Sequence, residues 1–339
     1  MTILGIETSC DECAAAVVRD GEKILSNIIA SQIPFHAPWS GVVPEIASRK
    51  HTEWIYQVTK EALAKAELNV NDIDAVAVTN RPGLFGSLLV GLSFAKAFSW
   101  ARGIPFIAVD HMLAHLYAPR LVNDLRPEYP FLGLLVSGGH TIICRADNFD
   151  DITVMGTTID DAVGEAFDKT AKFYNFGYPG GVVIDKMAAN GDSEAFRFPM
   201  PSLHKGDHRY DVSYSGLKNA VINQLDIFQK KKGTYTNEDI AASFQKTAVH
   251  ILLRALLNAA KDTGLTTVVA GGGVAANSYL RSCLLQQKHL RCVFPPLELC
   301  GDNGAMIAGI GYHYLARGEH SSLNITASAR VNGFKKKYP

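Results

Sequence analysis

Two histidines, His111 and His115, lie four residues apart in the segment VDHMLAHLYA, residues 109–118. Asp110 is a good helix N-cap, so the residues that follow it are predicted to form a helix. Side chains four residues apart project from one face of a helix, so the two imidazoles can bind one divalent metal ion. Two ligands leave such a site open. The sequence predicts a third ligand from elsewhere in the fold, and we identify it as Asp302.

The same histidine pair also suits a metalloprotease. A zinc protease of the HExxH type needs a glutamate directly after the first histidine as general base. That position is Met112, whose thioether cannot accept a proton, so proteolysis by this mechanism is disfavoured. A histidine pair at this spacing also arises by chance, in which case both side chains are ordinary core residues.

The elements around the histidines form two halves of similar outline. In the first half, apolar periodicity predicts strands and helices at 3–8, 14–20, 23–31, 46–68, 74–79, 88–102 and 105–109. The second half repeats this order with a strand, glycine turn and strand at 131–144, a strand at 267–270 that opens into the glycine loop 271–277, a strand at 292–295 and a helix near Asp302. An insertion in this half contains helices predicted at 160–175, 182–189 and 237–262.

This repetition predicts an α/β protein with two similar lobes around a central cleft. The expected division is an N-terminal lobe at 1–130 with the histidine pair, a C-terminal lobe at 131–310 with a helical insertion at about 160–265, and a C-terminal helix and tail at 311–339. The ends of corresponding strands would face each other across the cleft, so the histidines would meet Asp302 of the other lobe. Alternatively, Asp302 is only a first-turn carboxylate favoured by a helix dipole.

The composition limits the classes of function. Thirty-three basic and thirty-three acidic residues give no net charge, so tight binding to RNA without a partner is disfavoured. The N-terminus has no basic segment followed by a long apolar stretch, and no run of eighteen apolar residues occurs, so we expect a soluble, cytoplasmic protein without a membrane association. Six cysteines are too few for a disulfide scaffold and are expected to be reduced; Cys10 and Cys13 form a lone CxxC, which is a weak signal for zinc or redox chemistry.

Ten motifs together resemble one known family. In chain order they are ETSCDE, GVVPEIASRKH, PGLFGSLLVG, HMLAH, LVSGGHT, DDAVGEAFDKTAK, YPGG, YSGLK, GGGVAAN and DNGAMIA. The chain resembles the TsaD family of tRNA threonylcarbamoyladenosine synthesis proteins, once called O-sialoglycoprotease, over nearly its whole length. The resemblance implies an actin-like ATPase fold (ASKHA, ribonuclease H-like). It also implies transfer of the threonylcarbamoyl group of threonylcarbamoyl-AMP to N6 of the adenosine beside the anticodon, in tRNAs that read ANN codons.

The resemblance also implies roles for individual residues. By their motifs, His111, His115 and Asp302 match the family's metal ligands. The positions that match its substrate- and nucleotide-binding residues are Leu135, Val136, Ser137, Gly138, Gly139, Asp168, Gly181, Asp185 and Asn277. The general base is not indicated, and Glu12 on the first turn is a candidate. Leu113 and Ala114 depart from the HMEGH motif usual in bacteria. Neither residue is a metal ligand, so we expect metal binding to be retained, and the departure concerns only the contacts that other residues make with the ligands.

The resemblance further implies a cofactor and partners. It implies one divalent metal ion per subunit, with Fe²⁺ preferred over Zn²⁺, although imidazole and carboxylate ligands suit both. The implied partners are tRNA, a TsaB-like paralogue, a TsaE-like ATPase and a threonylcarbamoyl-AMP synthase as the upstream enzyme. Two alternatives remain open: a sugar or small-molecule kinase of the same fold, which needs no metal held by histidines, and a non-catalytic scaffold that only binds nucleotide.

Overall fold

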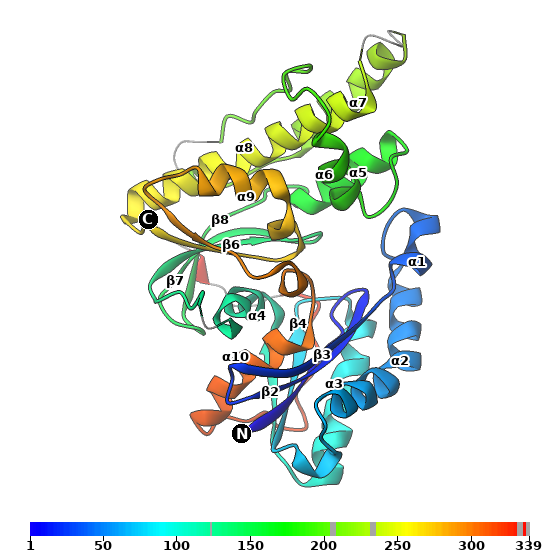
Figure 1. The fold of residues 1–339 in the computed structure, drawn as a ribbon, viewed down its shortest axis with the longest axis vertical. Coiled ribbons are helices and arrows are strands. Elements are labelled where there is room, and N and C mark those ends of the chain that lie inside the picture. The colour runs from blue at the N-terminus through cyan, green and yellow to red at the C-terminus, as the bar shows by residue number, and fades with distance from the viewer. Residues whose placement is uncertain (123, 204–207, 231–234, 331–334, 337–339) are drawn as a thin grey trace. The chain divides into compact units, whose positions relative to one another are not determined.

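The computed structural model describes residues 1–122, 124–203, 208–230, 235–330 and 335–336 of the chain (Figure 1). These residues divide into two compact units. Unit 1 comprises the described residues of 1–126 and 295–330, and unit 2 comprises those of 127–294 with 335–336. Each unit is built on one mixed β-sheet, which confirms the predicted α/β class.

Unit 1 contains a five-stranded sheet in the order β3-β2-β1-β4-β5. Its strands are β1 (Thr2–Glu7), β2 (Glu12–Arg19), β3 (Lys23–Ser31), β4 (Ala75–Arg81) and β5 (Phe106–Asp110). The first three strands form an antiparallel meander, whereas β4 runs parallel to β1, and β5 runs parallel to β4. Asp20 and Gly21 form the turn between β2 and β3 with positive φ angles of 53° and 72°, a conformation that glycine adopts without strain.

The two faces of this sheet are covered by different helices. The α-helices of unit 1 are α1 (Ile33–His36), α2 (Pro44–Lys65), α3 (Phe85–Arg102), α4 (His111–Tyr117) and α10 (Gly304–Ala316), with 3-10 helices at Ala37–Trp39, Val70–Asp72, Ala118–Leu121 and Leu297–Leu299. Ile6 and Val78 belong to the core beneath α2 and α3. Successive strand residues point to opposite faces, so Gly5 and Glu7 face the other side, where α10 packs against the sheet.

Unit 2 repeats this strand arrangement. Its sheet has the order β10-β9-β6-β7-β8-β11, with β6 (Phe131–Val136), β7 (Thr141–Ala146), β8 (Ile152–Thr157), β9 (Thr267–Gly271), β10 (Arg291–Val293) and β11 (Lys335–Lys336). Strands β6, β7 and β8 form an antiparallel meander, and β9 and β10 continue the sheet in parallel from β6. The predicted duplication is therefore confirmed at the level of strand topology. The strand β8 and the edge strand β11 were not predicted.

The helices of unit 2 lie in the insertion expected in this half, except for α9, which follows β9 and the glycine loop. They are α5 (Val163–Phe173), α6 (Gly180–Ala188), α7 (Ser215–Lys230), α8 (Asn237–Thr263) and α9 (Ser278–Leu285), with a 3-10 helix at Gly273–Ala276. Of these, α8 is long and apolar enough to cross a membrane by length and composition, and 72% of its most apolar window is buried inside the fold. It contributes Phe244, Leu252 and Leu256 to the core of unit 2, as a central core helix does.

The grouping of the C-terminal residues differs from the expected boundaries. Residues 295–330 belong to unit 1, whereas a second lobe extending to 310 and a separate tail from 311 were expected. The reason is that α10 is almost wholly apolar and covers the second face of the first sheet. Its approach is so close that a Cβ on Gly5 would lie 2.1 Å from the carbonyl oxygen of Gly304. The expected tail also includes 331–334 and 337–339, which lie outside the described residues.

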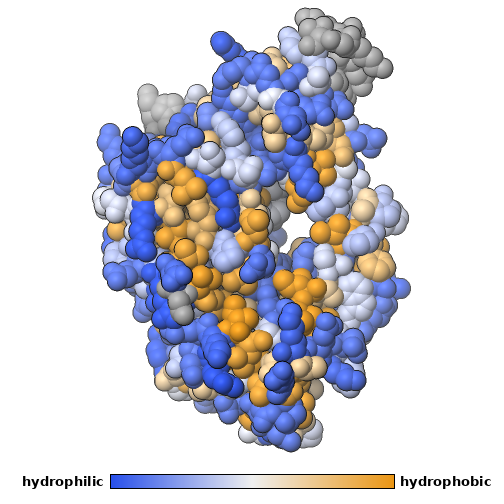
Figure 2. Space-filling model, in the orientation of Figure 1, coloured by the Kyte–Doolittle hydropathy of each residue, from blue (hydrophilic) through white to orange (hydrophobic). Residues whose placement is uncertain are grey.

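The surface is of mixed character. On the face shown in Figure 2, hydrophilic residues predominate and are interrupted by groups of hydrophobic residues. The most exposed large apolar side chains include Trp39, Tyr56 and Trp100, all in unit 1. All six cysteines are free thiols, as predicted.

Candidate metal centre and nucleotide-binding residues

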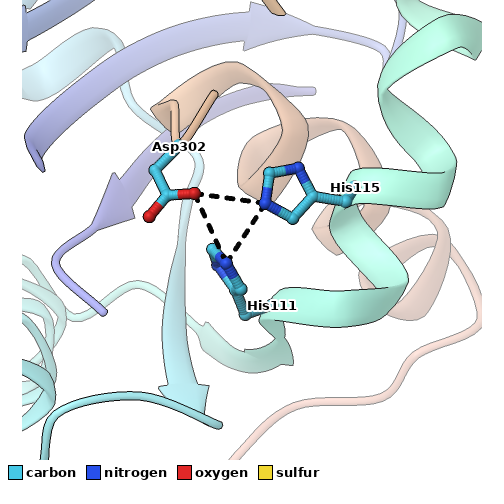
Figure 3. Close-up of side chains that lie close together, drawn as sticks. All are labelled: His111, His115 and Asp302. Atoms are coloured by element: carbon cyan, nitrogen blue, oxygen red, sulfur yellow. Dashed lines mark hydrogen bonds and ion pairs between the residues drawn. The ribbon is translucent and has the colours of Figure 1, made fainter. Parts of the chain in front are cut away.

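His111 and His115 lie on α4, directly after the edge strand β5. Asp110 is the N-cap of this helix, because its Oδ1 accepts hydrogen bonds from the backbone N–H groups of Met112 (2.9 Å) and Leu113 (3.4 Å). All seven residues of α4 are buried. The cap and the burial fix the helix, and the spacing of four residues directs both imidazoles to the same side, as predicted (Figure 3).

Asp302 reaches the same point from the segment before α10. The side chain of Asn303 accepts a hydrogen bond from the backbone N–H of Met306 (2.9 Å) and thereby caps α10 next to Asp302. Asp302 Oδ1 lies 3.1 Å from His115 Nε2 and 3.4 Å from His111 Nε2. The two Nε2 atoms are 3.1 Å apart (Figure 3). The fold therefore brings together the three residues identified as candidate ligands.

These three residues all belong to unit 1, although the sequence predicted a meeting of two lobes across a cleft. The chain leaves unit 2 after β10, and α10 then packs on the sheet of unit 1. Asp302 precedes α10 by two residues and so returns to the histidines within a single unit. The prediction that Asp302 lies next to the two histidines is therefore correct, and the prediction that it comes from the other lobe is wrong.

The spacing of the three ligand atoms fits a divalent cation. Bonds of about 2.0–2.2 Å at tetrahedral or octahedral angles place neighbouring ligand atoms roughly 3.0–3.5 Å apart. The separations of 3.1, 3.1 and 3.4 Å all fall within this range. Within the part of the chain that the structure describes, this is the one cluster of three or more His, Cys, Asp or Glu side chains with such geometry.

The two imidazoles differ in their electrostatic surroundings. Burial and the neighbouring His111 both lower the pKa of His115, so its imidazole is neutral and has a lone pair for a cation. Burial also acts to lower the pKa of His111, but the carboxylates of Asp302 and Glu7 outweigh it and raise that pKa to about 9. A cation that binds at His111 must displace a proton, which couples its affinity to pH.

Glu7, the last residue of β1, lies behind His111 and was not among the predicted site residues. Its side chain is fully buried, and its Oε2 lies 3.0 Å from His111 Nδ1. The same Oε2 accepts a hydrogen bond from Thr79 Oγ1 (2.5 Å), and Oε1 accepts one from the backbone N–H of Ser9 (2.5 Å). Although burial favours the neutral acid, His111 holds the pKa of Glu7 below its usual value. The sequence did contain a signal: a glutamate that ends a strand of wholly buried residues requires a partner.

Glu12, the candidate general base, is the first residue of β2 and lies in the same unit. Ser31 Oγ donates a hydrogen bond to its Oε1 (3.3 Å). Burial, and then the charges of Asp11 and Asp302, raise the pKa of Glu12 well above its usual value. A carboxyl group with a raised pKa can accept a proton near neutral pH.

The residues 112–114 between the two histidines belong to the core. Met112, Leu113 and Ala114 are buried, and none of them presents a group that can act as a general base. Leu113 and Ala114, which depart from the family motif, are therefore core residues, and the three ligand atoms converge with these residues in place.

The turn between β6 and β7 contains the predicted glycine-rich segment. Leu135 and Val136 end β6 with buried side chains, so only their backbone is available to a ligand. Ser137 Oγ accepts a hydrogen bond from the backbone N–H of His140 (3.1 Å) and closes the turn. A Cβ on Gly138 or Gly139 would meet no atom within 4 Å, so a ligand can approach the backbone there.

Asp168 and Gly181 lie where α5 meets the N-terminus of α6. Asp168 Oδ1 accepts a hydrogen bond from the backbone N–H of Gly180 (2.7 Å). Gly180 is packed so tightly that a Cβ would lie 2.7 Å from the Cα of Asp168, whereas a Cβ on Gly181 would meet nothing within 4 Å. Asp168 thus positions the start of α6, and Gly181, which has no side chain, leaves the backbone there accessible to a ligand.

Asp185 and Asn277 link α6 to the N-terminus of α9. Asp185 accepts hydrogen bonds from the backbone N–H of Ser278 (3.1 Å) and from its hydroxyl (2.8 Å), and a further one from Gln245 Nε2 (2.5 Å). Asn277 Oδ1 caps α9 through the backbone N–H of Leu280 (2.9 Å). The predicted nucleotide-binding residues therefore all lie in unit 2, at the end of β6, on the turn after it, on α5 and α6, and at the cap of α9.

Comparison with known proteins gives a consistent family. Residues 23–309 match TsaD, described as tRNA N6-adenosine threonylcarbamoyltransferase. A protein of that name from Treponema denticola is 66% identical over 337 residues, which cover 99% of each chain. Proteins of the same name from Treponema pallidum and Borreliella burgdorferi are 56% identical over 337 residues and 51% identical over 339 residues. These alignments cover 99% and 100% of this chain and 95% and 96% of the two relatives.

Solved structures of low sequence identity share the fold. Component A of the (R)-2-hydroxyglutaryl-CoA dehydratase of Acidaminococcus fermentans aligns with a TM-score of 0.57 at 15% identity, over 93% of this chain and 99% of that one. HypF from T. kodakarensis aligns with a TM-score of 0.61 at 14% identity, over 93% of this chain and 48% of its own. Both support the actin-like ATPase fold and, at such identities, the fold alone.

Proposed function

The chain belongs to the TsaD family of tRNA N6-adenosine threonylcarbamoyltransferases, and on this premise we propose that it transfers the threonylcarbamoyl group of L-threonylcarbamoyl-AMP to N6 of adenosine 37 in tRNAs that read ANN codons. The chain is a transferase that modifies tRNA. The observation that carries the finer proposal is the convergence of His111, His115 and Asp302 on one point.

The proposed reaction is an acyl transfer with a good leaving group. The N6 amine attacks the carbonyl carbon of the threonylcarbamoyl group and forms a C–N bond. The bond from that carbon to the phosphate oxygen breaks, AMP leaves with the electron pair, and the amine loses a proton. Because AMP leaves readily, the protein's main tasks are to position both substrates and to stabilise the charge on the carbonyl oxygen.

His111, His115 and Asp302 would hold one divalent cation, with Fe²⁺ preferred to Zn²⁺. The donor set fits the cation because His115 is neutral and the three ligand atoms are 3.1–3.4 Å apart. A cation bound there supplies Lewis acidity towards oxygen atoms of the substrate, because three protein ligands leave coordination positions open.

The adenylate part of the substrate would bind to unit 2. Gly138, Gly139 and Gly181 offer backbone that a phosphate or ribose can approach without a side chain in the way. Asp168 and Asp185 are the proposed acceptors for ribose hydroxyl groups, and each carboxylate also accepts a hydrogen bond from the backbone at the start of a helix, α6 or α9. Leu135 and Val136 would contribute through their backbone, and Ser137 and Asn277 would line the same turn and helix cap.

Glu12 is the proposed acceptor of the proton that the amine loses. Its raised pKa suits a general base that operates near neutral pH. It also lies close enough to Asp302 for that charge to contribute to the shift. A Glu12→Gln variant keeps the size of the side chain and should lose turnover much more than substrate binding.

The proposed partners are tRNA, a TsaB-like paralogue, a TsaE-like ATPase and a threonylcarbamoyl-AMP synthase that supplies the substrate, all in the cytoplasm. The equal numbers of basic and acidic residues support this proposal, because a chain without net charge attracts a polyanion only weakly. A partner that contributes basic surface would then supply much of the affinity for tRNA.

The test is reconstitution with tRNA, threonylcarbamoyl-AMP and the partner proteins, followed by nucleoside analysis of the tRNA. Protein purified without oxygen should contain about one metal ion per chain. His115→Ala and Asp302→Ala should lose both the metal and more than about 99% of the transfer, by analogy with loss of a metal ligand. His289→Ala, which alters an exposed histidine of unit 2, is the matched control and should keep both.

Other outcomes would favour another function. Full transfer by His115→Ala with no bound metal would refute the metal centre. Phosphorylation of a sugar from ATP without tRNA would instead indicate a kinase of this fold. Cleavage of a glycoprotein that is lost in His111→Ala would revive the metalloprotease, which Met112 disfavours.

A further inference from the structure

Glu7 is a buried carboxylate that the proposed reaction does not use directly. We propose that it is a positioning residue that fixes the ring of His111, with Nδ1–H donating to the Glu7 carboxylate and Nε2 presented to the cation. This inference rests on the proposed metal centre and adds to it a residue that determines the affinity of that centre. The observation that carries it is the 3.0 Å distance between Glu7 Oε2 and His111 Nδ1, opposite the nitrogen that faces Asp302.

The sheet delivers Glu7 to this position. On β1 the residues Leu4 and Ile6 belong to the core beneath α2 and α3, so Gly5 and Glu7 point to the face on which α10 packs. On the neighbouring parallel strand, Val78 likewise belongs to that core, and Thr79 points to the same face as Glu7. The strand register therefore places the carboxylate, the threonine hydroxyl and the metal-bearing helix on one side of the sheet.

Three donors hold the carboxylate in a single orientation. Ser9 N–H donates to Oε1, while Thr79 Oγ1–H and His111 Nδ1–H both donate to Oε2. With both oxygens engaged, the carboxylate cannot rotate away without leaving buried donors unpaired. An imidazole bound to a metal commonly donates its other N–H to a carboxylate, which fixes the tautomer and raises the basicity of the ligating nitrogen.

His115 shows the contrast within the same site. Its Nδ1 is buried and has no hydrogen-bond partner among the described residues. Asp302 and the cation therefore orient His115 only through Nε2, whereas His111 is held from both sides. Of the two histidines, it is therefore His111 that has neighbours at Nδ1, namely the Glu7 carboxylate at 3.0 Å and, at a longer distance of 3.3 Å, the hydroxyl of Ser9.

A glutamine at this position cannot satisfy the same three donors. If the amide oxygen faces His111 and Thr79, the amide NH₂ meets the N–H of Ser9, and two donors oppose each other. If the NH₂ faces His111, it favours the tautomer in which Nδ1 accepts and Nε2 carries the proton. That tautomer cannot bind a cation through Nε2.

The experiment measures Zn²⁺ affinity of the full-length chain by competition with a chelator, without any assay of transfer. Glu7→Gln should raise the Kd for Zn²⁺ by about 10- to 100-fold, as removal of such a carboxylate does in other metal sites. Thr79→Val removes one donor and keeps the charge, so it should raise the Kd by only a few-fold. Val78→Ala is the matched control: it removes apolar contacts on the same strand and should leave the Kd unchanged even though it lowers the thermal midpoint.

A spectroscopic measurement separates positioning from simple loss of stability. In Zn²⁺-loaded protein labelled with ¹⁵N, His111 should show a protonated Nδ1 that exchanges slowly with solvent, and Glu7→Gln should lose this signal. An unchanged Kd in folded Glu7→Gln, together with a retained Nδ1–H signal, would overturn the inference and leave the metal centre standing. If the wild-type chain does not bind Zn²⁺, both the metal centre and the role of Glu7 are overturned. His115→Ala serves as the reference, because Zn²⁺ binding that is lost in this variant is binding at the proposed centre.

Discussion

Gly5 allows α10, which begins two residues after Asp302, to pack closely on the sheet of unit 1. A Cβ on Gly5 would lie 2.1 Å from the carbonyl oxygen of Gly304, 2.7 Å from the backbone nitrogen of Ala308 and 2.8 Å from its Cβ. Two of these atoms belong to the backbone of α10, so no rotamer change can relieve the clash. Gly5→Ala must therefore push α10 away from β1.

The size of that displacement follows from the contact distances. Ordinary contact begins near 3.4 Å, so the carbonyl oxygen of Gly304 has to move by about 1.3 Å. Asp302 precedes Gly304 by two residues, so its side chain should move by a similar amount. Its Oδ1 now lies 3.1–3.4 Å from the histidine Nε2 atoms, and the shift would increase this distance to more than about 4 Å. Neighbouring ligand atoms of one cation lie at most roughly 3.5 Å apart. We expect the affinity for Zn²⁺ to fall at least about tenfold, in the range seen when support of a ligand is lost.

The same clash lowers stability. Overpacking of a well-packed core costs typically about 1–3 kcal/mol, and a clash with backbone places Gly5→Ala near about 3 kcal/mol. For a unit of this size that corresponds to a thermal midpoint lower by roughly 6–12 °C. The assay is thermal unfolding followed by circular dichroism, with Zn²⁺ affinity from chelator competition.

The control is another glycine next to Asp302. A Cβ on Gly301 would meet no atom within 4 Å, so Gly301→Ala should keep both the midpoint and the affinity for Zn²⁺. If Gly5→Ala unfolds within about 2 °C of the wild type and binds Zn²⁺ equally well, α10 is not seated on β1 as described. The steric account of the site would then be refuted.

Two further predictions concern the electrostatics of the site and the residues that would hold the adenylate. The pKa of His111 is raised to about 9, so at neutral pH a proton on His111 competes with the cation. The apparent Kd for Zn²⁺, measured by chelator competition with His115→Ala as the non-binding reference, should therefore fall roughly tenfold per pH unit between about pH 7 and 8.5. A Kd that does not change with pH would contradict this competition. Asp185→Ala should remove the hydrogen bonds to Ser278 and Gln245, each of which contributes about 1.5–3 kcal/mol because the carboxylate is charged. We expect AMP binding, measured by calorimetry, to weaken by about tenfold and the thermal midpoint to fall. If the midpoint falls and the affinity for AMP does not change, Asp185 has only a structural role.

Local patterns were sufficient to predict most of the strands and helices. The α4 helix was predictable because Asp110 is an N-cap with a short, strongly helical segment behind it, and the structure has that cap. The long helix α8 was predictable in the same way, since Thr236 and Asp239 form a capping box at its start and Gly264 adopts a positive φ of 69° at its end. These signals depend only on residues close together in the sequence, so the prediction of the helix does not depend on the tertiary fold.

The route of the C-terminal segment could not be predicted from such patterns. The sequence of α10 predicts a helix that is apolar on nearly every side, and this pattern does not indicate which of the two sheets the helix covers. What selects unit 1 is the fit of α10 against Gly5, which depends on a residue about 300 positions earlier in the chain. The sequence therefore predicted that Asp302 meets the histidines but not that it does so within one unit.

Glu7 was overlooked for a related reason. Read along the chain, it is one polar residue at the end of an apolar strand and resembles the start of a turn. Its role depends on Thr79 and His111, which come from two other elements. Pairwise geometry of this kind becomes visible only when the strand register is known.

The turns at equivalent places in the two units differ in the residues that they carry. The turn after β1 in unit 1 is next to the carboxyl groups of Glu7, Asp11 and Glu12. The turn after β6 in unit 2 has Gly138 and Gly139 at the corresponding place, with open space where side chains would be. A phosphate needs accessible backbone N–H groups, and Gly138 and Gly139 leave the backbone of the second turn open to one. The proposed cation site therefore lies beside the first turn, on α4 and in the segment before α10, whereas the proposed adenylate site includes the glycine turn of unit 2 and the helices next to it.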